Sequence, residues 1–183
     1  FVTARTFKTH FTATTFMQKS VLLEGSSLSV APVSVQETKD KIQFSYEVAV
    51  AKGQTTTIQK IGGYTVSMNH DDTILGAKKS IAKALEIGVS QLTENQKQAW
   101  ARIWEMSDIT IDGDVKAQQG IRFNIFQLNQ TYLGKDSRLN IGPKGFTGEK
   151  YGGSTYWDTE AYCIPFYMAT KDQQVARNLL AYR

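Results

Sequence analysis

The chain has 183 residues, of which 41% are hydrophobic and 21% are charged, and this composition argues against intrinsic disorder. The formal net charge of +4 is small, and the 21 lysine and arginine residues are spread along the sequence, which argues against nucleic-acid binding. No segment approaches the roughly 20 apolar residues that a membrane-spanning helix requires.

A single cysteine, Cys163, cannot form a disulfide within the chain, which favours a reducing compartment and predicts a cytoplasmic protein. The sequence opens at Phe1 in a Thr-rich run with a strand-like pattern. It closes at Arg183 in a helical pattern without a capping Gly or Asn. We therefore expect the chain to be part of a longer protein.

The first third of the chain has the polar and apolar alternation of antiparallel β-strands. Within residues 42–50 alternate positions are apolar, and residues 52–54 supply a turn before a β-branched run over residues 55–61. These two runs are expected to pair as a hairpin. The other expected strands cover residues 3–16 and 64–68.

Beyond Asp71 the apolar residues recur at spacings of three and four, which predicts a helix to about Leu85. A capping-box pattern over residues 93–96 predicts the start of a second helix. A third helix is expected to run from Asp114, as its N-cap, to about Tyr132. Its apolar face would bury Ile121, Ile125, Phe126 and Leu128.

Glycines are frequent over residues 133–155, which predicts a loop that exposes backbone amides. Helix is expected to resume at Trp157 or Asp158 and to reach about Tyr167. Pro165 would kink or end this helix if it lies beyond the first turn.

A last helix, capped by Asp172, would follow. Strands in the first third and helices afterwards predict an α+β chain with two structural regions rather than an interleaved α/β sheet. The helices after Asp114 are too few to close a domain, and they have the character of the first part of a helical barrel.

Trp157 and Asp158, beside the Gly-rich loop, suit a sugar, because an indole offers a flat apolar face and a carboxylate accepts hydroxyl hydrogen bonds. The alternative is a core aromatic residue beside a helix N-cap, and Asp158 could both cap and bind. The glycines and lysines of residues 142–150 could cradle phosphate. Their spacing fits no phosphate-binding motif, however, and a surface turn is favoured.

Other polar residues are expected to be structural. Glu149, Asp158 and Glu160 could supply a glycosidase carboxylate pair, but residues two apart on a helix point roughly 200° apart. We therefore expect Glu160 to bond to neighbouring helices or loops. Residues 108–114 lack the Gly and Glu positions of a calcium loop, which favours turn and capping roles. Structural roles are also expected for His10, His70 and Cys163, and for Arg122 either a carboxylate partner or a ligand contact.

Two stretches resemble glycoside hydrolase family 65, most of all its maltose phosphorylases: DGDVKAQQGIRFNIFQLNQTY at residues 112–132 and GPKGFTGEKYGGSTYWDTEAYCIPFY at residues 142–167. The resemblance implies a β-sandwich, a helical linker, an (α/α)6 barrel that carries the active site, and a small β-domain. On this scheme residues 1–68 end the N-terminal sandwich, residues 69–107 form the linker, and residues 108–183 begin the barrel.

Members of the family hold the non-reducing glucose through a Trp-Asp pair, so the resemblance assigns substrate binding to Trp157 and Asp158. It places the general acid, a Glu, and the phosphate ligands beyond Arg183, so no catalytic residue is expected in this chain. The isolated chain is therefore expected to be inactive.

The reaction that the resemblance implies is inverting phosphorolysis of maltose to β-glucose 1-phosphate and glucose, by one carboxylic acid and an attacking phosphate. Inorganic phosphate is the co-substrate, and neither a cofactor nor a metal is implied. The implied enzyme is a homodimer that binds a small disaccharide and neither nucleic acid nor membrane. Phosphorylases of trehalose, kojibiose or nigerose are alternatives, and so is a non-catalytic sugar-binding module.

Overall fold

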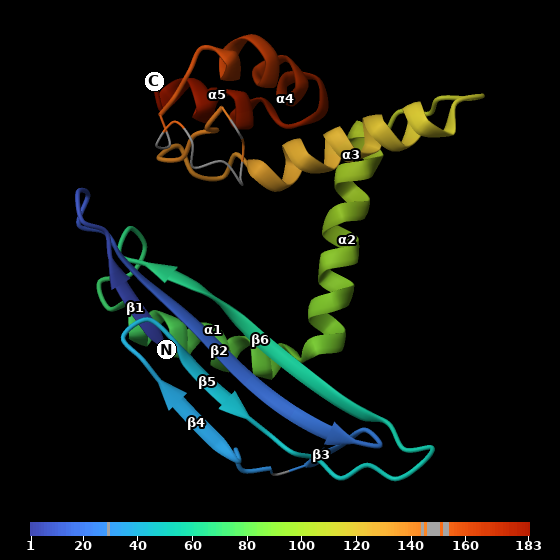
Figure 1. The fold of residues 1–183 in the computed structure, drawn as a ribbon. Helices are drawn as coiled ribbons and strands as arrows, with labels where there is room; N and C mark the ends of the chain where they lie inside the picture. The colour runs from blue at the N-terminus through green and yellow to red at the C-terminus, as the bar shows by residue number, and fades with distance from the viewer. Residues whose placement is uncertain (29, 144, 146–150, 152–153) are drawn as a thin grey trace. The chain divides into compact units, whose positions relative to one another are not determined.

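The computed structural model of the chain describes residues 1–28, 30–143, 145, 151 and 154–183 (Figure 1). It divides into two compact units, Phe1–Asn95 and Gln96–Arg183. The first unit contains antiparallel strands and helix, and the second is helical, so the predicted α+β class is confirmed. None of the helices in the described part of the chain is long and apolar enough to cross a lipid bilayer.

The first unit is built on a four-stranded antiparallel sheet whose central strand is β2 (Thr12–Leu23). Strand β6 (Thr56–Val66) pairs with β2 along almost its whole length, and the two strands lie side by side in Figure 1. The other edge of β2 pairs near its start with β1 (Val2–Arg5) and at its end with β3 (Ser26–Leu28). A separate antiparallel pair consists of β4 (Ser34–Glu37) and β5 (Ile42–Ser45).

Four expectations for the strands are wrong. The strand expected over residues 3–16 is interrupted by a turn that separates β1 from β2. Strand β5 ends at Ser45 and does not reach Val50. Strand β6 pairs with β2 rather than with β5, so residues 42–61 do not form a hairpin. Strand β6 is also one continuous strand to Val66, with no separate strand starting at Tyr64. An alternating pattern marks a half-buried strand, but it does not specify which partner that strand pairs with.

Phe16 on β2 is buried and lies directly opposite Gly63 on β6. A Cβ atom on Gly63 would come within 3.0 Å of the Phe16 ring, so the ring occupies the space that the glycine leaves open. An aromatic side chain that covers a cross-strand glycine in this way fixes the register of the two strands.

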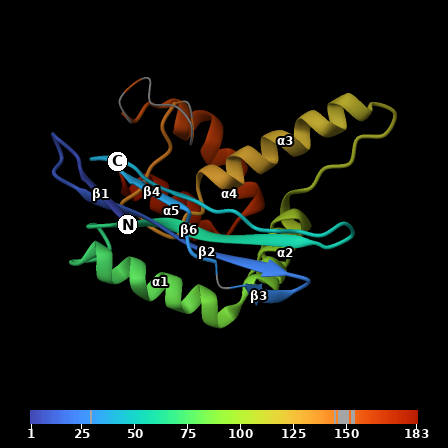
Figure 2. The same ribbon diagram turned by 60° about the horizontal axis from the view of Figure 1, so that its bottom comes forward.

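Helix α1 (Thr73–Ile87) packs against β2 and β6, and Figure 2 shows it running along one face of these strands. Its N-cap is Asp72, which accepts hydrogen bonds from two backbone N–H groups of the first turn, each at 2.9 Å. The buried hydroxyls of Thr14 and Thr73 are 2.7 Å apart, and the Thr65 hydroxyl donates to the Thr73 carbonyl at 2.7 Å. Hydrogen bonds as well as packing therefore hold the helix on the sheet.

Helix α2 (Val89–Ser107) follows α1 directly and runs across the boundary between the two units. The predicted capping box is wrong, because Thr93 lies inside this helix and its hydroxyl donates to the Val89 carbonyl at 2.9 Å. Helix α1 ends at Ile87 and α2 begins at Val89. Gly88 lies between them with a φ of 79°, a conformation that favours glycine.

After the last part of α2, the described part of the second unit contains three further α-helices and a π-helical turn: α3 (Val115–Thr131), η2 (Thr159–Cys163), α4 (Ile164–Thr170) and α5 (Gln173–Ala181). Two predicted N-caps are confirmed. Asp114 accepts from the Ala117 N–H at 2.9 Å at the start of α3. Asp172 accepts from the Gln174 N–H at 2.8 Å at the start of α5.

One hydrophobic core joins these helices, and its buried members are Tyr132, Ile141, Ile164, Tyr167, Val175, Ala176 and Leu179. Tyr167 is fully buried, and its hydroxyl donates to the Leu128 carbonyl at 2.7 Å, which ties α4 to α3. On α3, Ile125 is buried as predicted. Phe126 is not buried, and it instead stacks on Trp100 of α2 with ring centroids 5.0 Å apart.

Candidate functional site

Trp157 and Asp158 lie where the chain leaves the Gly-rich loop and enters helix. Asp158 is the first helical residue, and the following turn is π-helical: the Ile164 N–H donates to the Thr159 carbonyl, five residues back. Such turns insert one extra residue into a helix and recur at functional sites. The helix then continues as α4 to Thr170, beyond the predicted end at Tyr167. Pro165 follows directly after the π-helical turn and does not end the helix.

The inner side of this segment is anchored to the core. Thr159 is buried, and its hydroxyl donates to the Ile141 carbonyl at 3.1 Å. Ile141 belongs to the core cluster and lies in the loop that follows α3. The anchored Thr159 therefore fixes the backbone immediately after Asp158.

Both predicted sugar-binding residues are exposed. The Trp157 side chain is 66% exposed, so Trp157 is not a core aromatic residue of this unit. Asp158 has helical backbone angles, and its side chain makes no capping hydrogen bond, so the alternative in which Asp158 also caps the helix is wrong. An exposed indole beside an exposed carboxylate that does not cap the helix is an arrangement that can receive a polyol.

A shallow groove borders Trp157, and its other lining residues are Glu160, Ala161, Leu180 and Arg183. The exposed ring of Tyr162 lies beside Trp157, with ring centroids 6.2 Å apart and the rings tilted by 39°. Sequence reasoning did not identify Tyr162 or Arg183 near the site. Residues five apart do not share a face of an α-helix, and only the π-helical turn brings Tyr162 beside Trp157.

Glu160 bonds to a neighbouring helix end, as predicted. Its carboxylate accepts from Arg183 Nε at 2.5 Å and from Nη2 at 3.1 Å. These hydrogen bonds lower the pKa of the Glu160 carboxyl group. Glu160 is therefore held in its anionic form, which does not suit a proton donor in glycosidic cleavage.

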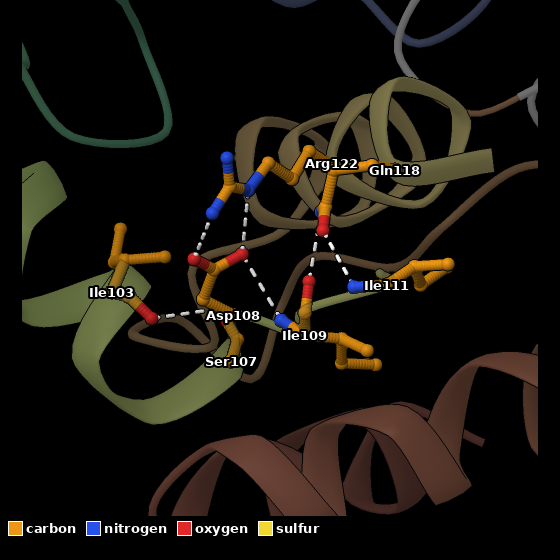
Figure 3. Close-up of polar contacts among 7 residues, drawn as sticks. All are labelled: Ile103, Ser107, Asp108, Ile109, Ile111, Gln118 and Arg122. Carbon is orange, nitrogen blue, oxygen red and sulfur yellow. Dashed lines mark hydrogen bonds and ion pairs between the residues drawn. The ribbon is translucent and has the colours of Figure 1, made fainter. Parts of the chain in front are cut away.

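The acidic residues before α3 have the structural roles that were expected (Figure 3). Asp108 accepts from Arg122 Nε at 2.8 Å and from Nη2 at 2.6 Å, which lowers the pKa of Asp108. Gln118 accepts from the Ile111 N–H at 2.7 Å and donates to the Ile109 carbonyl at 2.8 Å. Together these contacts hold the DITI segment against α3, and Arg122 has a carboxylate partner.

The two histidines and the cysteine have different surroundings. His10 lies in the turn between β1 and β2, at a φ of 57°. The His70 ring packs so closely on Gly76 that a Cβ there would come within 2.8 Å of it. Burial raises the pKa of the half-buried Cys163 thiol, and Asp158 and Glu160 raise it further. Within the described ranges, no three His, Cys, Asp or Glu side chains gather to hold a metal ion.

Part of the Gly-rich loop lies outside the described residues: positions 144, 146–150 and 152–153. The phosphate-cradle alternative and the expectation for Glu149 fall largely on these positions. The described loop residues 133–143 contain turns and neither helix nor strand, as predicted.

Comparison with known proteins identifies relatives for both parts of the chain. It is 52% identical to maltose phosphorylase of Bacillus subtilis (strain 168) over 113 residues, which cover 62% of this chain and 15% of that protein. It is 35% identical to α,α-trehalose phosphorylase of Thermoanaerobacter brockii over 153 residues, which cover 82% of this chain and 20% of that protein. With kojibiose hydrolase of Flavobacterium johnsoniae the identity is 30% over 161 residues, 87% of this chain and 23% of that protein.

A solved structure is also similar to this chain. It is described as a candidate kojibiose phosphorylase from the human microbiome, and it aligns with a TM-score of 0.76 at 28% identity, over 100% of this chain and 23% of its own. The chain thus spans less than a quarter of the length of each of these relatives.

Two family models match the sequence. The N-terminal domain model of glycosyl hydrolase family 65 matches residues 1–103, and the central catalytic domain model of the same family matches residues 122–183. The first match alone covers more than half of the chain, and it is consistent with a β-sandwich followed by the start of a helical barrel. The chain belongs to glycosyl hydrolase family 65.

Proposed function

We propose that this chain is part of a disaccharide phosphorylase that cleaves maltose with inorganic phosphate to give β-glucose 1-phosphate and glucose. The observation that carries the proposal is the 52% identity with a maltose phosphorylase, over 113 residues. The exposed Trp157 and Asp158 support it, because they leave an aromatic face and a carboxylate open to a sugar.

In the proposed reaction, Trp157 and Asp158 hold the non-reducing glucose and leave the chemistry to groups elsewhere in the longer protein. A carboxylic acid beyond Arg183 protonates the leaving oxygen while phosphate attacks the opposite face of the sugar. Phosphate is already anionic, so no protein base is needed. The contribution of this segment to the rate is orientation of the glucose relative to both groups.

We also propose the domain division that the resemblance implies. Residues 1–68 end the sandwich, and the last strand of the four-stranded sheet, β6, ends at Val66. Residues 69–107 form the linker and contain α1 and α2. Residues 108–183 begin the barrel. We propose a cytoplasmic homodimer that uses phosphate as its only co-substrate, and the single cysteine agrees with a reducing compartment.

Purified full-length protein tests the function when it is incubated with maltose, trehalose, kojibiose or nigerose, each with and without phosphate. We expect β-glucose 1-phosphate from maltose, only when phosphate is present. Phosphorolysis of another disaccharide in the panel would assign that linkage instead. Release of glucose from maltose without phosphate would contradict the proposal and indicate a hydrolase. One relative, from Flavobacterium johnsoniae, is named a kojibiose hydrolase.

A further inference from the structure

The guanidinium group of Arg183 connects two positions on either side of the Trp157–Asp158 pair. On one side, Arg183 Nη1 donates to the Thr155 hydroxyl at 2.5 Å. On the other side, Nε and Nη2 donate to the two carboxylate oxygens of Glu160, at 2.5 Å and 3.1 Å. One side chain therefore bridges a residue two positions before the pair and a residue two positions after it.

The backbone position of Arg183 is fixed by the packing of α5. Arg183 follows α5, whose residues Val175, Ala176 and Leu179 are buried in the core of the second unit. The Arg183 backbone N–H donates to the Leu180 carbonyl at 3.2 Å, so the helical path continues to this residue. The backbone that carries the Arg183 side chain is therefore fixed by a helix that packs in the core.

The bridge complements the anchor on the inner side of the same segment. Thr159 is buried and bonded to Ile141, which fixes the backbone from the core side. Arg183 holds the outer side, where the Glu160 and Arg183 side chains are only 30% and 35% exposed. A planar fork that engages both carboxylate oxygens restricts direction as well as distance, and a lysine ammonium group cannot reproduce this geometry.

We infer that Arg183 is a positioning residue for the proposed glucose site: it holds the segment 155–160 so that Trp157 and Asp158 keep one fixed orientation. Trp157, Glu160 and Arg183 line the same groove, which places the bridge next to the indole that it would orient. The inference rests on the proposed function. Its substrate is the same disaccharide, and Arg183 itself acts through Thr155 and Glu160.

The test uses steady-state kinetics of the full-length protein with maltose and saturating phosphate, and the variants Arg183→Met, Arg183→Lys and Glu160→Gln. We expect Arg183→Met to raise KM for maltose roughly tenfold, because Trp157 and Asp158 lose their fixed orientation toward the sugar, with a smaller change in kcat. Arg183→Lys should raise KM for maltose about as much as Arg183→Met. Lysine keeps the positive charge, but it cannot bind both carboxylate oxygens of Glu160 in the bidentate geometry of arginine. The double variant Arg183→Met/Glu160→Gln should be no worse than Arg183→Met alone.

The matched control is Arg122→Met, which removes a bidentate pair of similar geometry with Asp108. It should leave KM for maltose unchanged. If Arg183→Met lowers only thermal stability and leaves KM unchanged, or if Arg183→Lys restores wild-type KM, the inference is overturned. A separate measurement distinguishes failure of the positioning role from failure of the proposed glucose site. If Trp157→Ala raises KM for maltose while Arg183→Met does not, the glucose site is supported and only the positioning role of Arg183 fails.

Discussion

Asp158 and Glu160 lie two residues apart, but their carboxylates have different surroundings. Arg183 donates two hydrogen bonds to Glu160, which lowers the pKa of Glu160 and keeps it ionised at neutral pH. Asp158 is exposed and makes no capping hydrogen bond. Because Glu160 is occupied by its partner, Asp158 is the carboxylate of this segment that can accept hydrogen bonds from a sugar.

The reactivity of the Cys163 thiol tests the burial and the charges around this segment. Burial raises the pKa of its thiol, and the Asp158 and Glu160 carboxylates raise it further, so less of the reactive thiolate exists at any pH below that pKa. We expect iodoacetamide to alkylate Cys163 at least several-fold more slowly in the folded protein than in urea at pH 8. Mass spectrometry of the peptide that contains Cys163 measures the rate.

The charge contribution to Cys163 has its own control. Asp158→Asn removes one of the two carboxylates that raise the pKa of the thiol, so this variant should be alkylated faster than the wild type. Equal rates in folded and unfolded protein would show that the thiol is neither buried nor near these carboxylates.

At the scale of elements, strong local signals were predictable and distant pairings were not. The Asp114 cap and the extent of α3 follow from an N-cap residue before a run with helical spacing, and the structure confirms them. The partner of β6 could not be predicted, because its pairing with β2 joins Ala13 to Val66 across the whole β region. The start of α2 was predicted wrongly because residues 93–96 have the sequence pattern of a capping box although they lie inside the helix.

The Asp114 cap gives a prediction for the start of α3. Asp114→Ala removes the acceptor of the Ala117 N–H, which costs about 1 kcal/mol of local helix stability, equivalent to roughly fivefold faster amide exchange in the first turn. Hydrogen–deuterium exchange of the peptide over residues 115–121 measures this change.

Asp112→Ala is the matched control for the α3 cap. Asp112 is an exposed aspartate two residues earlier that lies outside the helix and its cap, so its removal should leave the exchange rate unchanged. Equal exchange in the two variants would contradict the assignment of Asp114 as the cap.

At the scale of the whole molecule, each family model matches a different part of the chain and leaves residues 104–121 between the two matches. This connection has defined contacts: Asp108 pairs with Arg122, and Gln118 bonds to the backbone of Ile109 and Ile111. The start of α3 is therefore tied to the segment that leads into it.

The candidate site was only partly predictable. Trp157 and Asp158 followed from resemblance to a family, since a Trp-Asp pair at a helix start has a common structural alternative. Their exposure, the π-helical turn and the Arg183 bridge required the structure. These features depend on a helix register and on an ion pair between Glu160 and Arg183, and no local sequence pattern encodes either of them.

The most direct test of the proposed glucose site is the kinetics of Asp158→Asn in the full-length protein, with maltose and phosphate as substrates. The Asp158 side chain does not cap its helix, so we expect unfolding stability to change by no more than about 0.5 kcal/mol. Loss of a charged acceptor for sugar hydroxyls should lower kcat/KM roughly a hundredfold, the size of effect expected for one strong hydrogen bond to a charged group. Unchanged kcat/KM in a normally folded variant would contradict the glucose-binding role of Asp158.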